Sequence, residues 1–129
     1  MTDPEPQKVL VISCDAEGTS VLGAFLRACG MKAVFCESVQ ECRAALEPGD
    51  VTLVFCDSCL KDGDYREVMR LAAASGVHPP VVVTSRLDDT SQYLEAMRLG
   101  AFDFMARPFR RSEIEWIVQN AMRKTVVAA

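Results

Sequence analysis

The chain has 129 residues, 50% of them hydrophobic, which is long and apolar enough for one globular domain with a core of its own. Fourteen basic and eighteen acidic side chains give a net charge of -4, which argues against a nucleic-acid-binding surface. No apolar stretch approaches the roughly 18 to 20 residues of a membrane span, and residues 1–7 do not resemble a signal peptide. We therefore expect a cytoplasmic protein with no membrane and no nucleic acid among its partners.

Uncharged runs rich in β-branched residues alternate with stretches of helical periodicity. The runs are typical of strands buried on both faces, and the periodic stretches indicate helices that cover a sheet. Five strands and five helices in alternation predict an α/β fold with a parallel sheet covered on both faces. In chain order the sequence predicts a tail over 1–7, strand 8–13, helix 17–29, strand 31–36, a helix capped by Ser38, strand 51–57, a polar loop over 58–63, helix 65–74, strand 81–84, helix 90–99, strand 102–106 and a last helix after Pro108, with a domain over 8–124 and a C-terminal tail over 125–129.

Asp57 ends the uncharged run from Val51 to Cys56 and is the candidate centre of a site. A strand buried on both faces cannot easily hold a carboxylate in the core, so we expect Asp57 where the strand emerges from it. Open α/β sheets place their ligand crevices at this carboxyl edge. An Asp at a strand end also commonly caps a turn, and the run alone is consistent with either role.

The six cysteines, at positions 14, 29, 36, 42, 56 and 59, are expected to be reduced, because no export signal accompanies them. Cys56 and Cys59 have C-x-x-C spacing, but no second pair and no neighbouring histidine completes a zinc site. His78, the only histidine, precedes Pro79-Pro80 and is expected to be a surface residue without a chemical role.

Over almost its whole length, from about residue 8 to about residue 124, the chain resembles the receiver domain of two-component response regulators. This resemblance implies a flavodoxin-like (βα)5 single domain with a parallel five-stranded sheet of order 2-1-3-4-5. It also implies a bacterial signalling protein that is not an ordinary enzyme, with a histidine kinase or another signalling protein as its partner. The residues that carry the resemblance are Asp57 after strand three, Thr84 after strand four, Gly100-Ala101, and Ala106-Arg107-Pro108-Phe109 after strand five.

The resemblance assigns a role to each of these polar residues. In typical receivers the Asp after strand three accepts a phosphoryl group, an acidic pair after strand one helps to bind Mg²⁺, a Thr or Ser after strand four contacts the phosphate, and a Lys before Pro neutralises it. Asp57 is then the phosphoacceptor, Thr84 contacts the phosphate, and Arg107 replaces the Lys. The Arg107-Pro108 peptide is expected to be cis, as the family's Lys-Pro bond is.

The acidic pair is missing, because Ser13 and Cys14 stand in its place and Asp15 lies one position beyond. Mg²⁺ prefers carboxylate, carbonyl and water oxygens, so a metal site made of Asp57 and Asp15 is expected to be weak or absent. Asp15 would replace the pair only if the strand end shifted by one residue, and such a shift also moves the side chain to the other face. The planar fork of Arg107 can pair bidentately with Asp57 in the absence of phosphate.

Three functions are compatible with these residues. The first is an atypical receiver with weak or lost phosphorylation, which acts by protein-protein contact. The second is a conventional receiver that a histidine kinase phosphorylates on Asp57. The third is a thiol switch that uses Cys14, Cys56 and Cys59, because strands one and three are neighbours in the expected fold and end at the same edge.

The last helix is expected to carry Trp116 on its outer face, two residues round the helix from Ile114 on the inner stripe. An exposed Trp is typical of binding hot spots, and the resemblance implies that the last helix, the fourth helix and the fifth strand form a dimer or output surface. We therefore expect an interface of Trp116, Phe104 and Tyr93 that serves a homodimer or a partner. The alternative is a half-buried Trp that lies over its neighbours.

Overall fold

The computed structural model describes residues 7–86 and 90–128, and in them strands and helices alternate as predicted. The main strands lie within two residues of their expected bounds. They are β1 (Lys8–Ile12), β2 (Lys32–Cys36), β3 (Val51–Asp57), β6 (Val81–Ser85) and β7 (Asp103–Ala106). The helices are α1 (Ala16–Ala28), α2 (Val39–Leu46), α3 (Tyr65–Ala74), α4 (Thr90–Arg98) and α5 (Arg111–Ala128).

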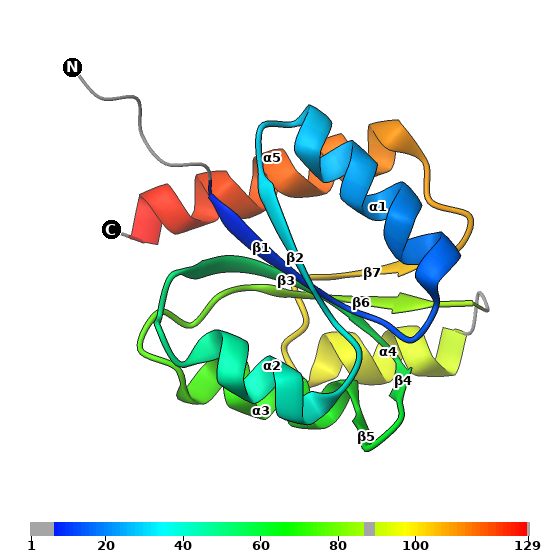
Figure 1. Cartoon of the computed structure of the whole chain (residues 1–129), viewed down its shortest axis with the longest axis vertical. Helices are drawn as coiled ribbons and strands as arrows, with labels where there is room; N and C mark the ends of the chain where they lie inside the picture. The colour runs from blue at the N-terminus through cyan, green and yellow to red at the C-terminus, as the bar shows by residue number, and fades with distance from the viewer. Residues whose placement is uncertain (1–6, 87–89, 129) are drawn as a thin grey trace.

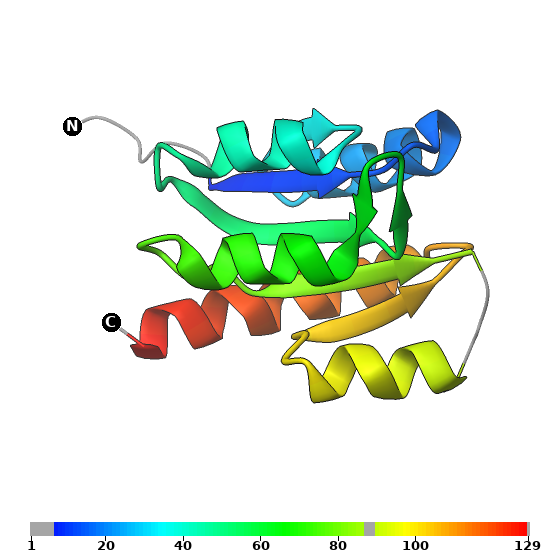
Figure 2. The same cartoon turned by 90° about the horizontal axis from the view of Figure 1, so that it is seen from below.

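The five main strands form one parallel sheet in the order β2-β1-β3-β6-β7. Helices α1 and α5 cover one face of this sheet, and α2, α3 and α4 cover the other (Figures 1 and 2). Counted without the short strands β4 and β5, the order is 2-1-3-4-5, so the predicted flavodoxin-like fold is confirmed.

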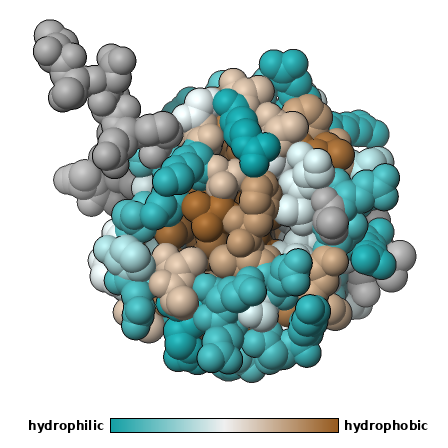
Figure 3. Space-filling model, viewed as in Figure 1, coloured by the Kyte–Doolittle hydropathy of each residue, from teal (hydrophilic) through white to brown (hydrophobic). Residues whose placement is uncertain are grey.

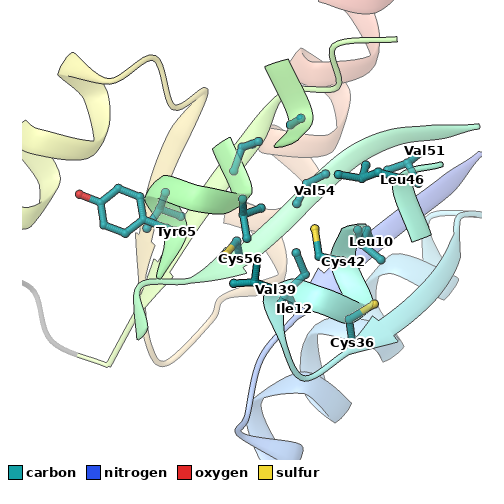
Figure 4. Packing of buried hydrophobic residues seen from close by; sticks show 14 of the residues in the cluster. Leu10, Ile12, Cys36, Val39, Cys42, Leu46, Val51, Val54, Cys56 and Tyr65 are labelled. Atoms are coloured by element: carbon teal, nitrogen blue, oxygen red, sulfur yellow. The ribbon is translucent and has the colours of Figure 1, made fainter. Parts of the chain in front are cut away.

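Each face of the sheet has its own apolar core, because successive side chains of a buried strand point to opposite faces. Leu10, Ile12 and Cys56 pack under α2 and α3 (Figure 4), whereas Val11 and Phe55 pack under α1 and α5. Since both faces of β1 and β3 are covered, the polar residues that follow these strands meet at the carboxyl edge of the sheet.

Residues 58–63, which we expected to form a polar loop, instead contain most of a short antiparallel hairpin. The hairpin consists of β4 (Cys59–Leu60) and β5 (Gly63–Asp64). Asp62 lies in the turn of this hairpin. Its carboxylate accepts hydrogen bonds from the backbone N–H groups of Val39 and Gln40 at 2.8 and 3.2 Å. These bonds satisfy N–H groups in the first turn of α2, which have no partner within the helix, and so fix the hairpin against that helix.

Helix α5 continues to Ala128, four residues beyond residue 124, where the predicted domain ends. Of the two predicted tails, residues 1–6 and residue 129 lie outside the described residues. Within the described part of the chain, no helix combines the length and the apolar character that crossing a membrane requires.

The outer strand β2 exposes apolar side chains near the middle of one face of the molecule, as Figure 3 shows in brown. Phe35 is 42% exposed, and its ring lies 5.5 Å from the Arg27 guanidinium of α1. The ring also lies against the backbone of Gly23, where an added Cβ would come within 2.6 Å of it. A glycine at this position of α1 therefore lets the edge strand pack closely on the helix.

Candidate functional site

Three side chains from neighbouring strand ends surround Asp57 at the carboxyl edge of the sheet. Ser13 follows β1, Thr84 lies opposite Asp57 in the pairing of β3 with β6, and Arg107 follows β7. Asp57 is 9% exposed, and Ser13 and Thr84 are buried beside it. The structure therefore brings together the predicted residues Asp57, Thr84 and Arg107, and adds Ser13 to them.

Both carboxylate oxygens of Asp57 accept hydrogen bonds from these neighbours. The Ser13 hydroxyl donates to Oδ2 at 2.5 Å, and the Thr84 hydroxyl donates to Oδ1. Nη2 of Arg107 donates to Oδ1 at 2.9 Å and to Oδ2 at 3.1 Å. The buried negative charge of Asp57 is thus paired with a guanidinium and hydrogen-bonded on both oxygens, which is the condition under which burying a charge is tolerated.

Arg107 pairs with Asp57 through one nitrogen, and not through both prongs of its fork as the sequence suggested. The reason is a second carboxylate: Nη1 lies 3.4 Å from Oδ2 of Asp15. The guanidinium also lies 5.4 Å from the centre of the Phe109 ring. Arg107 therefore bridges Asp57 and Asp15, and the peptide that follows it, Arg107-Pro108, is cis as predicted.

Asp15 is the N-cap of α1, a role that the sequence analysis did not give it. Its Oδ1 accepts hydrogen bonds from the backbone N–H groups of Glu17 and Gly18 at 3.2 and 3.4 Å. The bond from Gly18 is the main cause that lowers the pKa of the Asp15 carboxyl below its ordinary value, and the charge of Arg107 lowers it further. One oxygen of Asp15 is thus occupied by the helix and the other faces Arg107.

Cys14 is directed away from Asp57. Its thiol donates to the carbonyl oxygen of Glu37, after β2, at 3.3 Å, and the residue is exposed. Of the two positions that the acidic pair would occupy, Ser13 therefore faces Asp57 as a hydrogen-bond donor, and Cys14 contributes no contact to the carboxylate.

The side chains around Asp57 do not match the ligands that Mg²⁺ prefers. Among the described residues, no three His, Cys, Asp or Glu side chains gather in a group that could hold a metal ion. The carboxylate oxygens already accept bonds from Ser13, Thr84 and Arg107, and the guanidinium places positive charge beside them. A dication would have to compete with that charge for a hard-oxygen site that contains a single uncommitted carboxylate at most.

Gly18 is a site residue that sequence reasoning missed. A Cβ at this position would lie 2.8 Å from Nε of Arg107 and 3.0 Å from Oδ2 of Asp15, so only glycine leaves room for the guanidinium against the first turn of α1. Nε of Arg107 is buried there without a hydrogen-bond partner. The sequence did contain a signal for this role. Gly18 lies three residues after Asp15, in the first turn of a helix, where alanine would ordinarily give a more stable helix than glycine.

The residues of the predicted interface lie on α4, β7 and α5. Trp116 is 59% exposed on α5, so its predicted outward position is confirmed. The ring of Tyr93, which is exposed on α4, meets the half-buried ring of Phe104 edge to face at 5.8 Å. That these residues form an interface stays a prediction.

His78 is exposed in the loop between α3 and β6, away from the Asp57 cluster.

An open hollow of about 820 Å³ lies between the ends of α3 and α4 and the start of β6. Its lining is almost entirely apolar and includes Met69 and Met97, with His78 as the only titratable side chain. We place the candidate site at Asp57, because convergent, partly buried charged groups mark a chemical site better than size does.

The model of the response regulator receiver domain matches residues 9–119. The chain belongs to this family. Similar proteins include the two-component response regulator EHD1 of Oryza sativa subsp. indica, 29% identical over 94% of this chain, and the transcriptional regulatory protein FixJ of Bradyrhizobium diazoefficiens, 26% identical over 94%. The chain spans 36% of the length of the rice regulator and 59% of that of FixJ. Because such regulators occur in plants and in bacteria, the expected bacterial source stays a prediction.

Solved receiver structures share the fold at low sequence identity. A response regulator from Chloroflexus aurantiacus is 21% identical with a TM-score of 0.84, covering 92% of this chain and 98% of its own. The receiver domain of the sensor histidine kinase PA1611 from Pseudomonas aeruginosa, whose structure holds a magnesium ion in its active-site cleft, is 20% identical with a TM-score of 0.79, covering 89% and 96%. In this receiver chain, Arg107 and Ser13 both donate hydrogen bonds to Asp57.

Proposed function

We propose that this chain is an atypical receiver, in which Mg²⁺-dependent phosphorylation of Asp57 is weak or lost and signalling depends on protein-protein contact. The observation that carries this proposal is the Asp57 carboxylate, both of whose oxygens accept hydrogen bonds from side chains of the same chain. A phosphoacceptor in this family has instead to attack phosphorus while a divalent cation offsets the gathered negative charge.

The arrangement around Asp57 opposes this reaction in two ways. An attacking oxygen would first have to give up its bond to Arg107 and its bond to one hydroxyl, that of Thr84 at Oδ1 or that of Ser13 at Oδ2. Separating a buried carboxylate from its guanidinium partner typically costs about 3 to 5 kcal/mol when nothing replaces the partner. Replacement by Mg²⁺ is also poor, because a hydroxyl and a thiol stand where two carboxylates would attract the ion.

A second candidate function is a conventional receiver phosphorylated on Asp57. It is favoured by the position of Asp57 on a hollow of about 360 Å³ that Thr84 and Arg107 also line. In this case Arg107 would move from the carboxylate to the phosphoryl oxygens, as the Lys of typical receivers does. The two candidates differ in how tightly Mg²⁺ binds beside Asp57.

The partners that we propose are a histidine kinase or another signalling protein, met in the cytoplasm, and a second copy of the chain. A structural neighbour, the beryllofluoride-activated NtrC4 receiver domain, is a dimer; it is 19% identical with a TM-score of 0.85. The surface we assign to such contacts carries Trp116, Phe104 and Tyr93 on α5, β7 and α4. Within this proposal the chain is a signalling domain and not an enzyme.

Restoring the acidic pair tests the proposal at the metal site. The variant Ser13→Asp with Cys14→Asp should bind Mg²⁺ at least about tenfold more tightly than the unmodified chain in isothermal titration calorimetry, a gain of roughly 1.4 kcal/mol. Adding Asp57→Asn to this variant should remove most of the gain. Mg²⁺ binding by the unmodified chain as tight as that of the restored variant would contradict the proposal and favour the conventional receiver.

A further inference from the structure

Two exposed cysteines, Cys14 and Cys59, line the same hollow of about 360 Å³ in front of Asp57. Cys14 follows β1, and Cys59 begins the hairpin after β3. Strands β1 and β3 are neighbours with Ile12 opposite Cys56, so continuing this register places Cys14 beside residue 58 and next to Cys59. The topology thus places two thiols that lie 45 positions apart in the sequence on the same hollow.

Three of the other cysteines are separated from this pair by burial. Cys36, Cys42 and Cys56 lie in the core under α2 and α3 (Figure 4), where burial raises the pKa of Cys36 to about 11 and that of Cys42 to about 12. Buried thiols of this kind act as small apolar side chains. The C-x-x-C pair of the sequence is therefore divided, with Cys56 in the core and Cys59 on the surface.

We propose that Cys14 and Cys59 form a redox-modification site, a dithiol that small organic disulfides such as glutathione disulfide convert into an intramolecular disulfide. In the first step one thiol, as its thiolate, attacks the small disulfide, forms a mixed disulfide and releases one small thiol. In the second step the other cysteine attacks the protein sulfur of that mixed disulfide and releases the second small thiol. Two protein thiols are oxidised and one small disulfide is reduced to two thiols.

The surroundings of the two thiols favour this reaction. Arg86, exposed on the rim of the hollow, presents a positive charge that attracts an anionic disulfide such as glutathione disulfide. The only bond that Cys14 gives up when its side chain turns toward Cys59 is its thiol bond to the Glu37 carbonyl, and a thiol is a weak donor.

The bridge would join Cys14, two residues beyond the end of β1, to the hairpin after β3, across the approach to Asp57. Access to the carboxylate would then depend on the thiol redox state and be restored by excess small thiol. This consequence holds whether or not Asp57 accepts a phosphoryl group, so the proposal stands apart from the proposed function.

The test treats the folded, reduced chain with glutathione disulfide and follows it by intact mass and by peptide mapping without reduction. The expected product has lost the mass of two hydrogen atoms and contains a peptide that joins Cys14 to Cys59. The variants Cys14→Ser and Cys59→Ser should each gain one glutathione on the remaining cysteine of the pair. Cys29→Ser, which changes a half-buried cysteine on α1, is the matched control and should behave as the unmodified chain.

Circular dichroism shows whether each variant is folded, and an excess of small thiol should return the oxidised chain to its starting mass. The proposal is overturned if the unmodified chain accumulates two stable glutathione adducts without a cross-link, if neither cysteine reacts, or if the cross-link contains a cysteine other than 14 and 59.

Discussion

Arg107 occupies the most densely connected position of the site, between the carboxylates of Asp57 and Asp15. A lysine carries its charge at one point and could serve one of these partners at a time, whereas the guanidinium presents separate nitrogens to both. The fork therefore ties the end of β3 to the first turn of α1. This connection holds the candidate phosphoacceptor in place with groups of the chain itself.

Gly18→Ala should change stability differently depending on whether Arg107 is present. In a helix, alanine is more stable than glycine by about 0.5 to 1 kcal/mol, and this gain should appear in an Arg107→Ala background. With Arg107 in place the gain should vanish or change sign, because the new Cβ would lie 2.8 Å from Nε of Arg107. Urea denaturation of the four proteins measures the difference; equal stabilisation in both backgrounds would show that Gly18 does not position the guanidinium.

Asp15→Asn should make the free energy of unfolding depend less on pH under acidic conditions. The pKa of the Asp15 carboxyl is lowered in the folded chain, first by the Gly18 N–H bond and then by Arg107, so the folded state favours the ionised form. Its contribution to stability is present above the ordinary pKa of 3.8 and is lost as the pH falls below that value. Asparagine retains the cap but not the charge.

The measurement is the free energy of unfolding of both proteins between neutral pH and about pH 3, a window set by the ordinary pKa of Asp. The unmodified chain should be the more stable one at neutral pH, and the difference should shrink on acidification below 3.8. A difference that does not change with pH would mean that the charge of Asp15 contributes nothing to the bridge.

At the scale of elements, the sequence predicted the five main strands and all helices, because each carries its own signal. Buried runs, helical spacing and the Ser38 cap are local patterns, and the cap is observed, with Ser38 accepting from the Glu41 N–H at 3.1 Å. The hairpin of β4 and β5 was missed because its two-residue strands have no periodicity of their own. The hairpin is stabilised by the hydrogen bond between Asp62 and the Val39 N–H group of α2. These two residues are 23 positions apart in the sequence, so no local pattern reveals the contact.

Trp116→Ala on α5 should weaken association and leave folding almost unchanged. The side chain is 59% exposed, so its removal should alter the free energy of unfolding by no more than about 0.5 kcal/mol, whereas an exposed Trp in an interface contributes strongly to binding. Sedimentation velocity over a concentration series, together with partner pull-downs, measures the effect. Val77→Ala, which truncates a 42% exposed side chain in the loop after α3, is the control; if both variants behave alike, α5 is not the interface.

For the molecule as a whole, the sequence predicted the fold and most of the residues of the site. It did not predict how those residues bond to one another. Asp57, Thr84 and Arg107 follow strand ends, and parallel strands bring their carboxyl ends to one edge, so topology alone places them together. The pairing of Arg107 with two carboxylates depends on the cap of α1 and on the space at Gly18. Neither of these contacts is visible in a strand pattern.

We propose that the chain holds its candidate phosphoacceptor, Asp57, with its own side chains and offers Mg²⁺ a poor site beside it. The most direct test is incubation of the unmodified chain with acetyl phosphate, or with beryllofluoride, with and without Mg²⁺, followed by intact mass or phosphate-sensitive electrophoresis. We expect slow labelling or none, and clear Mg²⁺-dependent labelling of the variant Ser13→Asp with Cys14→Asp, abolished by Asp57→Asn. Rapid, Mg²⁺-dependent labelling of the unmodified chain that Asp57→Asn blocks would instead identify a conventional receiver.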